Sequence, residues 1–276
     1  MIIRVLTLSH PLTIVAEPLT AVAFAPFGAV LANPAPDVHP QPNDAHTNPP
    51  LLPDFGAVSA NQRTAIQYRK IAPPLRNLYA QFSPTAAAAV AAASSSSDKA
   101  DKAERLLGGE PRTTIFVCGA RQLAPDPENG TGDGASLLEV GLLERHPFTT
   151  QTFVPLGASA SSTRYLVIVA PSLPPDDSGN ERDSSLPTPP RSHKDGLPGP
   201  GMPDVQQLRA FVATGAQAVT YGAGTWHAPM AALGTPGSAI DFVVIQFAND
   251  VPIEDCQEVV LEGECVRTKV VPTPQG

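Results

Sequence analysis

A series of short, strand-like segments separated by turn residues is the feature that most limits how this chain can fold. RTTIFVCGARQL (112–123), TRYLVIVAP (163–171) and AIDFVVIQFAN (239–249) are rich in β-branched and aromatic residues and are bounded by Gly, Pro or Asn. SLLEVGLLER (136–145), TQTFVPLG (150–157) and AQAVTYG (216–222) share this pattern, and residues 1–17 are expected to begin the fold as a strand. Many short strands with few helices predict a mainly β protein, either a sandwich or a barrel of the jelly-roll or cupin type.

One helix is predicted after residue 203, in PDVQQLRAFVATG. Pro203 and Asp204 suit a helix start, and Gly215 suits a helix end. Leu208 gives an apolar face together with Phe211 or Val212.

Three segments of biased composition interrupt the strands. Residues 33–56 are rich in proline, residues 83–104 pass from an alanine run to a serine run, and residues 171–203 combine proline with charge. The alanine run favours a helix, whereas the serine run and the third segment offer little to bury and are expected to be disordered. Because no module long enough to fold alone lies between them, we interpret residues 1–276 as a single domain with flexible insertions.

Composition excludes several classes of function. A net charge of −8 argues against nucleic-acid binding, which needs a basic face. No apolar run has the length of a membrane span, and the N-terminal stretch lacks a small-residue cleavage site. Three cysteines without a CxxC spacing argue against a disulfide framework or a zinc knuckle. The chain is therefore expected to be soluble and cytoplasmic, with no nucleic-acid or membrane partner.

Two stretches carry the residues that can perform chemistry. In LLERHPFTTQTFVPLG (142–157), strand alternation places Glu144 and His146 on one face, and Gln151 follows the Pro147 corner. In QAVTYGAGTWHAPM (217–230), the glycines predict a tight turn that presents Trp226 and His227 after Tyr221.

The spacing of these residues resembles that of cupins. In that pattern one strand carries ligand-x-ligand, a third ligand follows shortly after, and a glycine-x-x-histidine comes later. Glu144, His146 and Gln151 stand at the first three ligand positions, and Gly224 with His227 matches the last. Two imidazoles and a carboxylate suit a divalent metal, although Gln151 is a weaker ligand than a carboxylate.

Each of these residues also has a plain structural explanation. Glu144 with Arg145 is compatible with a surface pair, His146 with a turn cap, and Trp226 with a core side chain. The combination in cupin-like spacing favours a functional site over these separate explanations.

Longer blocks resemble the ureidoglycolate lyase family, once called ureidoglycolate hydrolase. The blocks are LLERHPFTTQTFVPLG, YLVIVAP, LRAFVATGAQAVTYGAGTWHAPM and IDFVVIQFANDVPIEDCQEV, with FAPFGAVL and SANQRTAIQY nearer the N-terminus. The resemblance implies a cupin-like β-barrel, a homodimer, and cleavage of (S)-ureidoglycolate to glyoxylate and urea during allantoin breakdown in purine catabolism. Two departures are Arg63, where a small residue is expected, and the length of the insertions.

The chemistry of that reaction suggests roles for these residues. Breaking the C–N bond requires removal of the hydroxyl proton and protonation of the departing urea nitrogen, and a histidine performs either step near neutral pH. We assign His227 as general base and His146 as general acid or metal ligand, with Glu144 orienting His146 or sharing the metal. Gln151, Tyr221 and Trp226 are expected to contact substrate, and either Arg63 or Arg112 to bind its carboxylate.

Three other readings remain open from sequence alone. The first is a non-catalytic cupin that binds a small acid. The second is a different metal-dependent cupin enzyme, such as an isomerase or dioxygenase. The third is an amidohydrolase that acts on the same substrate and releases ammonia and carbon dioxide. No glycine-rich phosphate loop follows a strand, so a nucleotide cofactor is not expected.

Overall fold

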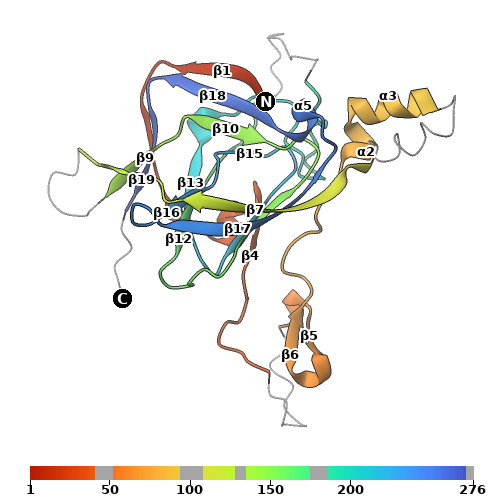
Figure 1. Cartoon of the computed structure of the whole chain (residues 1–276), viewed down its shortest axis with the longest axis vertical. Helices are drawn as coiled ribbons and strands as arrows, with labels where there is room; N and C mark the ends of the chain where they lie inside the picture. Colours follow the sequence, from red (N-terminus) through yellow and green to blue (C-terminus); the bar gives the residue numbers. More distant parts are fainter. Residues whose placement is uncertain (41–51, 94–107, 128–134, 175–185, 272–276) are drawn as a thin grey trace.

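Strands make up most of the regular structure in the computed structural model, which describes residues 1–40, 52–93, 108–127, 135–174 and 186–271 (Figure 1). The described strands form sheets of eight, five, four and two strands, with no single sheet closing into a barrel. The prediction of a mainly β protein with few short helices is confirmed.

The eight-stranded sheet positions most of the site. Its order is β1 (Ile2–Leu8), β18 (Gln257–Gly263), β10 (Leu142–Arg145), β15 (Trp226–His227), β12 (Arg164–Ala170), β13 (Arg209–Thr214) and β3 (Glu17–Pro18), and β16 (Ala231–Leu233) also pairs with β12. The five-stranded sheet runs β4 (Gly28–Leu31), β14 (Ala218–Tyr221), β11 (Gln151–Pro155), β17 (Ala239–Ala248) and β7 (Glu110–Gly119).

The remaining elements are smaller. The four-stranded sheet contains β2 (Leu12–Val15), β19 (Val266–Val270), β9 (Ser136–Glu139) and β8 (Ala124–Pro125), and the two-stranded sheet contains β5 (Ala57–Ala60) and β6 (Ala65–Tyr68). The helices among the described residues are α1 (Ala21–Phe24), α2 (Tyr79–Phe82), α3 (Pro84–Ala93) and α5 (Pro252–Asp255), with 3-10 turns η1 (Pro53–Phe55), η2 (Asn61–Arg63) and η3 (Val205–Gln207). None of the described helices has the length and apolar character that crossing a membrane requires.

The eight-stranded sheet separates two hydrophobic cores, because β12 is buried on both of its faces. Val167 and Val169 point into the first core, which is shared with Phe153 and Phe242 of the five-stranded sheet. The alternate residues of β12 point into the second core. Burying a side chain of this size contributes about 1.5–3 kcal/mol, so β12 is a central source of stability.

The helix predicted in residues 203–215 is wrong. Only η3 is helical there, and β13 follows, paired antiparallel with β12 from Arg164↔Thr214 to Val169↔Arg209. Leu208 belongs to the second core and Phe211 to the first, so the apolar residues serve two opposite faces instead of one helical stripe. Pairing with a buried strand overrides a weak local helix preference.

The structure describes parts of the three biased segments. The helix expected in the alanine run is confirmed as α3, while residues 41–51, 94–104 and 175–185 of these segments lie outside the described residues. Residues 186–203, which belong to the third segment, pack on the main body: Leu197 is buried, and Gln257 Nε2 donates to the Pro187 carbonyl at 2.9 Å.

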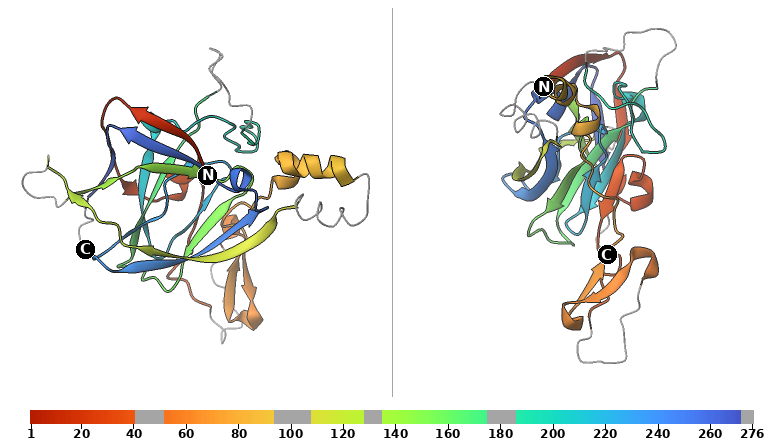
Figure 2. Two further views of the ribbon diagram at one scale, coloured as in Figure 1. Left: turned by 45° about the horizontal axis from the view of Figure 1, so that its top comes forward. Right: turned by 90° about the vertical axis from the view of Figure 1, so that its right-hand side faces the viewer.

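The β5–β6 hairpin projects away from the sheets that form the cores (Figure 2). Asn61, Gln62 and Arg63 follow β5 with φ values of 48°, 55° and 73°. Positive φ is uncommon for residues other than glycine, so this turn is a strained feature of the hairpin.

Candidate active site

Glu144 and His227 lie directly opposite one another on the neighbouring antiparallel strands β10 and β15. Their side chains share one face of the sheet, and His227 Nε2 lies 3.4 Å from Glu144 Oε1. His227 Nε2 has no hydrogen-bond partner. The two groups are therefore close enough to interact electrostatically, yet the imidazole lone pair stays available.

His146 follows β10 at the Pro147 corner and completes a cluster of three. Its ring centroid lies 5.6 Å from that of His227, and both rings are buried. His146 Nδ1 lies 2.6 Å from the Asp255 carbonyl oxygen, while Nε2 has no partner. Because a carbonyl oxygen accepts hydrogen bonds, Nδ1 carries the proton and Nε2 keeps its lone pair.

The glycine turn before β15 fixes the orientation of His227. Gly224 has a φ of 78° and its N–H donates to the His146 carbonyl at 2.8 Å, so the turn joins the two histidine segments. His227 Nδ1 lies 3.0 Å from the Thr225 carbonyl, and the Tyr221 ring stacks on the imidazole at 3.9 Å with an interplanar angle of 12°. The turn and the stacking aim Nε2 at Glu144.

The cluster favours a charged carboxylate and a neutral imidazole. Burial works against ionisation of Glu144, but its interactions with His227 and His146 outweigh burial and lower its pKa to about 2. Burial, together with the nearby His227, lowers the pKa of His146 below its usual value. At neutral pH, Glu144 is therefore an anion and His146 is a base or a ligand rather than a proton donor.

The same three residues fit a divalent metal ion. One ligand atom from each of Glu144, His146 and His227 lies within 4.8 Å of the others. Two buried imidazole nitrogens with free lone pairs and one carboxylate are the donor set that such ions prefer.

Gln151 joins this cluster through the five-stranded sheet. It lies opposite Tyr221 on β11 and β14, and its Nε2 donates to Gln246 Oε1 at 2.7 Å, which leaves Gln151 Oε1 buried and without a partner. The sequence reasoning missed Gln246. The signal was present in IDFVVIQFAN, where Gln246 takes the next position after the inward-facing Phe242 and Val244.

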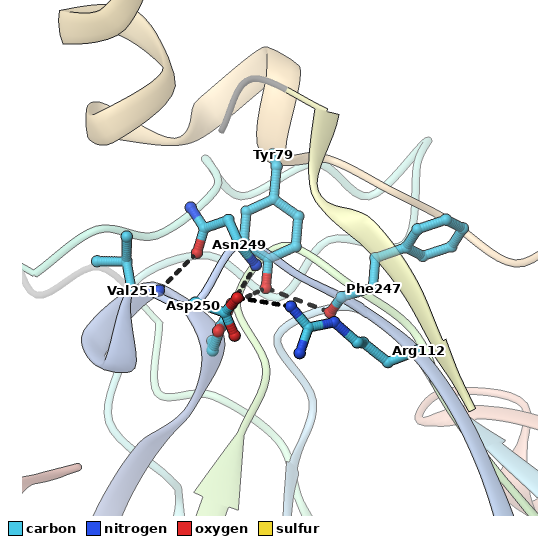
Figure 3. Close-up of polar contacts among 7 residues, drawn as sticks. Tyr79, Arg112, Phe247, Asn249, Asp250 and Val251 are labelled. Carbon is cyan, nitrogen blue, oxygen red and sulfur yellow. Dashed lines mark hydrogen bonds and ion pairs between the residues drawn. The ribbon is translucent and has the colours of Figure 1, made fainter. Parts of the chain in front are cut away.

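Arg112 lies at the same end of the five-stranded sheet. It is directly opposite Gln246 in the β7–β17 pairing, so both side chains leave the sheet on the same face. Its Nη2 lies 2.6 Å from Asp250 Oδ2 (Figure 3). Both partners are largely exposed, so this ion pair is weak and the guanidinium can exchange Asp250 for another carboxylate.

Two predicted substrate contacts lie elsewhere. Trp226 is adjacent to His227 on β15 and so faces the opposite side, where it belongs to the second core and its Nε1 donates to the Gly201 carbonyl at 3.0 Å. Arg63 lies on the projecting β5–β6 hairpin and is exposed. The structure thus brings together Glu144, His146, Gln151, Tyr221 and His227, and it places Trp226 and Arg63 apart from them.

Comparisons with known proteins support one family. Residues 11–267 match the family model described as ureidoglycolate lyase. The chain is 31% identical over 244 residues to a protein named ureidoglycolate lyase from Schizosaccharomyces pombe, covering 88% of this chain and 89% of that protein.

Two other relatives carry the same name over shorter stretches. The Saccharomyces cerevisiae protein is 39% identical over 122 residues, which is 43% of this chain and 49% of that protein. A Burkholderia mallei protein is 31% identical over 143 residues, covering 52% and 56%. Taken with the match along nearly the whole chain, these similarities show that the chain belongs to the ureidoglycolate lyase family of enzymes.

Proposed function

We propose that this chain cleaves (S)-ureidoglycolate to glyoxylate and urea in the breakdown of allantoin, a step of purine catabolism and nitrogen utilisation. The observation that carries the proposal is the buried cluster of Glu144, His146 and His227, in which both histidine Nε2 atoms lack partners. Family membership supplies the substrate.

A single histidine can carry out both proton transfers of the reaction. His227 Nε2 takes the proton from the substrate hydroxyl, the oxygen lone pair forms the new carbonyl, and the C–N bond breaks. The same proton then passes from His227 to the departing urea nitrogen, so neither water nor another reactant is consumed. The Glu144 carboxylate stabilises the imidazolium that exists between the two transfers.

The remaining residues bind the substrate. We assign its carboxylate to Arg112 rather than to Arg63, because Arg112 shares a sheet end with Gln246 and Gln151. Gln151 Oε1 accepts from the ureido N–H groups. Tyr221 packs under His227, and we leave Trp226 out of the site because it lies in the second core.

Metal dependence is the alternative form of the same proposal. Glu144, His146 and His227 would hold a divalent ion, with Gln151 as a weaker fourth ligand. The Lewis acidity of the ion would lower the pKa of the substrate hydroxyl. The lowered pKa of His146 favours its role as a ligand over that of general acid.

The test is a product analysis with fresh racemic ureidoglycolate, after subtraction of the spontaneous decay measured without enzyme. We expect equal amounts of urea and glyoxylate from one enantiomer. A rate that survives a chelator assigns the proton transfer to His227 alone, and a rate restored by a divalent ion assigns the metal form. Ammonia in place of urea would instead support an amidohydrolase, and no rate above background would support a non-catalytic binding protein.

We also propose a homodimer formed along β7. This strand is the last in the five-stranded sheet, and Ile115, Phe116 and Val117 are 54%, 45% and 69% exposed. An unpaired edge with three consecutive large apolar side chains favours pairing with a second copy, and a two-fold axis would let β7 pair with itself antiparallel.

Light scattering on a sizing column tests this interface. Wild-type protein and the control V22K, which changes an exposed valine on α1, are expected to be dimers, whereas V117K is expected to be monomeric. A monomeric wild type, or a V117K variant that stays dimeric, would exclude β7 as the interface.

The cytoplasm is the compartment we propose for this reaction. Cys118, Cys256 and Cys265 are all free, as expected of a protein kept in a reducing environment.

A further inference from the structure

A cavity of about 850 Å³ lies next to the cluster of Glu144, His146 and His227. Its walls include the residues around Phe27 at the start of β4, the loop around Arg76, Ser172 after β12, the segment from Arg191 to Pro198, and the turn that contains Thr225. Glu144, His146 and His227 do not line it. The volume is in the range of pockets that bind small molecules, about 300–1,000 Å³.

The lining of this cavity is basic in a chain whose net charge is −8. Arg76, Arg191 and Arg209 line it, and Asp195 is the acidic residue among the lining residues. Arg209 is already held by Glu17, with both oxygens 3.1 Å from Nη2. Arg76 and Arg191 are held by carbonyl oxygens instead, which leaves their charge without a neutralising carboxylate among the described contacts.

Two polar groups in the lining are buried and lack partners. Ser172 is 8% exposed, and its hydroxyl has no hydrogen-bond partner. Arg191 Nε is likewise buried and without a partner, while Arg191 Nη2 donates to the Ser172 and Leu173 carbonyls at 3.2 and 2.5 Å. These bonds fix the guanidinium beside Ser172. Leaving such buried donors unpaired is unfavourable, and a bound acceptor removes that cost.

The cavity is connected to the catalytic histidine through one residue. Thr225 lines the cavity, its hydroxyl donates to the Phe27 carbonyl at 3.1 Å, and its own carbonyl lies 3.0 Å from His227 Nδ1. The N–H of Gly222 donates to the same Phe27 carbonyl at 2.8 Å. A ligand in the cavity therefore contacts the turn that orients His227 without occupying the reaction site.

We propose that this cavity binds a small anion bearing a carboxylate or phosphate group, at a site separate from the catalytic cluster. Arg191 and Arg76 supply the positive charge, and the Ser172 hydroxyl donates a hydrogen bond to an anionic oxygen. Guanidinium groups pair with the planar or tetrahedral oxygens of either ligand class, so the binding measurements must separate the two.

The test is isothermal titration calorimetry at low ionic strength with two probes, inorganic phosphate and oxalate. The wild type is expected to bind at least one of them at one site per chain, and added sodium chloride is expected to weaken binding. Binding of phosphate alone assigns a phosphate-bearing ligand, and preference for oxalate assigns a carboxylate.

Variants identify the site that the probe occupies. We expect R191Q to weaken binding at least tenfold, S172A and R76Q to weaken it several-fold, and the exposed control R121Q to bind like the wild type. If R191Q fails to fold, as judged by circular dichroism, S172A and R76Q decide. Binding by neither probe, or equal binding by the wild type and the cavity variants, would overturn the proposal.

The H227A variant separates this proposal from the proposed reaction. It is expected to lose turnover and keep anion binding, because His227 does not line the cavity. Loss of anion binding in H227A would place the anion at the catalytic cluster and overturn the separate site. If the wild type does not turn over ureidoglycolate, the proposed reaction fails. The titrations of the wild type and the cavity variants still decide whether the cavity binds an anion.

Discussion

The two faces of the β10–β15 pair bury polar side chains in opposite ways. On one face, the Arg145 guanidinium lies over the Trp226 ring at 4.4 Å and donates to Gln257 Oε1 and to the carbonyls of the 199–201 segment. On the other face, His227 and His146 each keep one nitrogen without a partner beside Glu144. A buried polar group whose bonds are complete serves the fold, whereas one with an open lone pair is ready for a ligand.

Electrostatics separates the two faces further. Burial lowers the pKa of Arg145 to about 9, which still leaves the guanidinium charged at neutral pH. Glu144 is instead anionic at neutral pH, because its interactions with His227 and His146 lower its pKa to about 2 against the effect of burial. The first arrangement is fixed and the second can change its protonation during a reaction.

W226A tests the structural face and has the largest effect that we expect on stability. Removing a fully buried indole leaves a cavity and takes away the ring beneath Arg145, at a cost of about 3–5 kcal/mol. Guanidinium chloride denaturation measures the loss. The control L156A removes an exposed side chain and is expected to change stability little. A similarly small change in W226A would contradict the assignment of Trp226 to the hydrophobic core.

R112Q tests the proposed role of Arg112 in binding the substrate carboxylate. Loss of a charge-assisted pair with the substrate carboxylate costs about 1.5–3 kcal/mol, so KM is expected to rise about tenfold to a hundredfold with unfolding unchanged. D250N is the matched control, because it removes the ion-pair partner and keeps the arginine. An unchanged KM in R112Q with a raised KM in R63Q would move the role to the β5–β6 hairpin.

Q246A has the smallest effect on kinetics that we expect. It tests whether the hydrogen bond from Gln151 to Gln246 positions Gln151. Loss of one hydrogen bond to Gln151 Nε2 costs about 1 kcal/mol, so we expect KM to rise about fivefold while kcat changes less. Steady-state kinetics beside the exposed control Q122A decides this. Equal kinetics in both variants would show that Gln151 needs no support from Gln246.

The strands and the clustering of Glu144, His146 and His227 were predictable because their signals are local. Alternation and β-branched content marked β7, β12 and β17, and the spacing of Glu144, His146 and His227 marked the site. The direction of the Trp226 side chain was also predictable, since consecutive residues of a strand point to opposite faces. Trp226 was instead predicted to lie in the site because it precedes His227 in the chain.

The features that could not be predicted from the sequence depend on contacts between residues that lie far apart in the chain. The sequence of residues 208–214 has a helical pattern, but in the structure these residues pair with β12. Gln246, the hydrogen-bond partner of Gln151, lies 95 residues away in the sequence. The 186–203 segment offers few apolar side chains of its own, yet its carbonyl groups accept from Arg145, and Arg191 from it lines the proposed anion-binding cavity. None of these contacts follows from local composition.

The most direct test of the central claim is the rate of urea release by H227A, measured beside its unfolding free energy and beside the exposed control H10A. We expect kcat to fall by about 10²–10⁴, the usual contribution of a general base, in a variant that still folds, with H10A fully active. A variant that folds normally and keeps near-wild-type kcat would contradict the account, because the open lone pair on the catalytic face would then serve no step of the reaction.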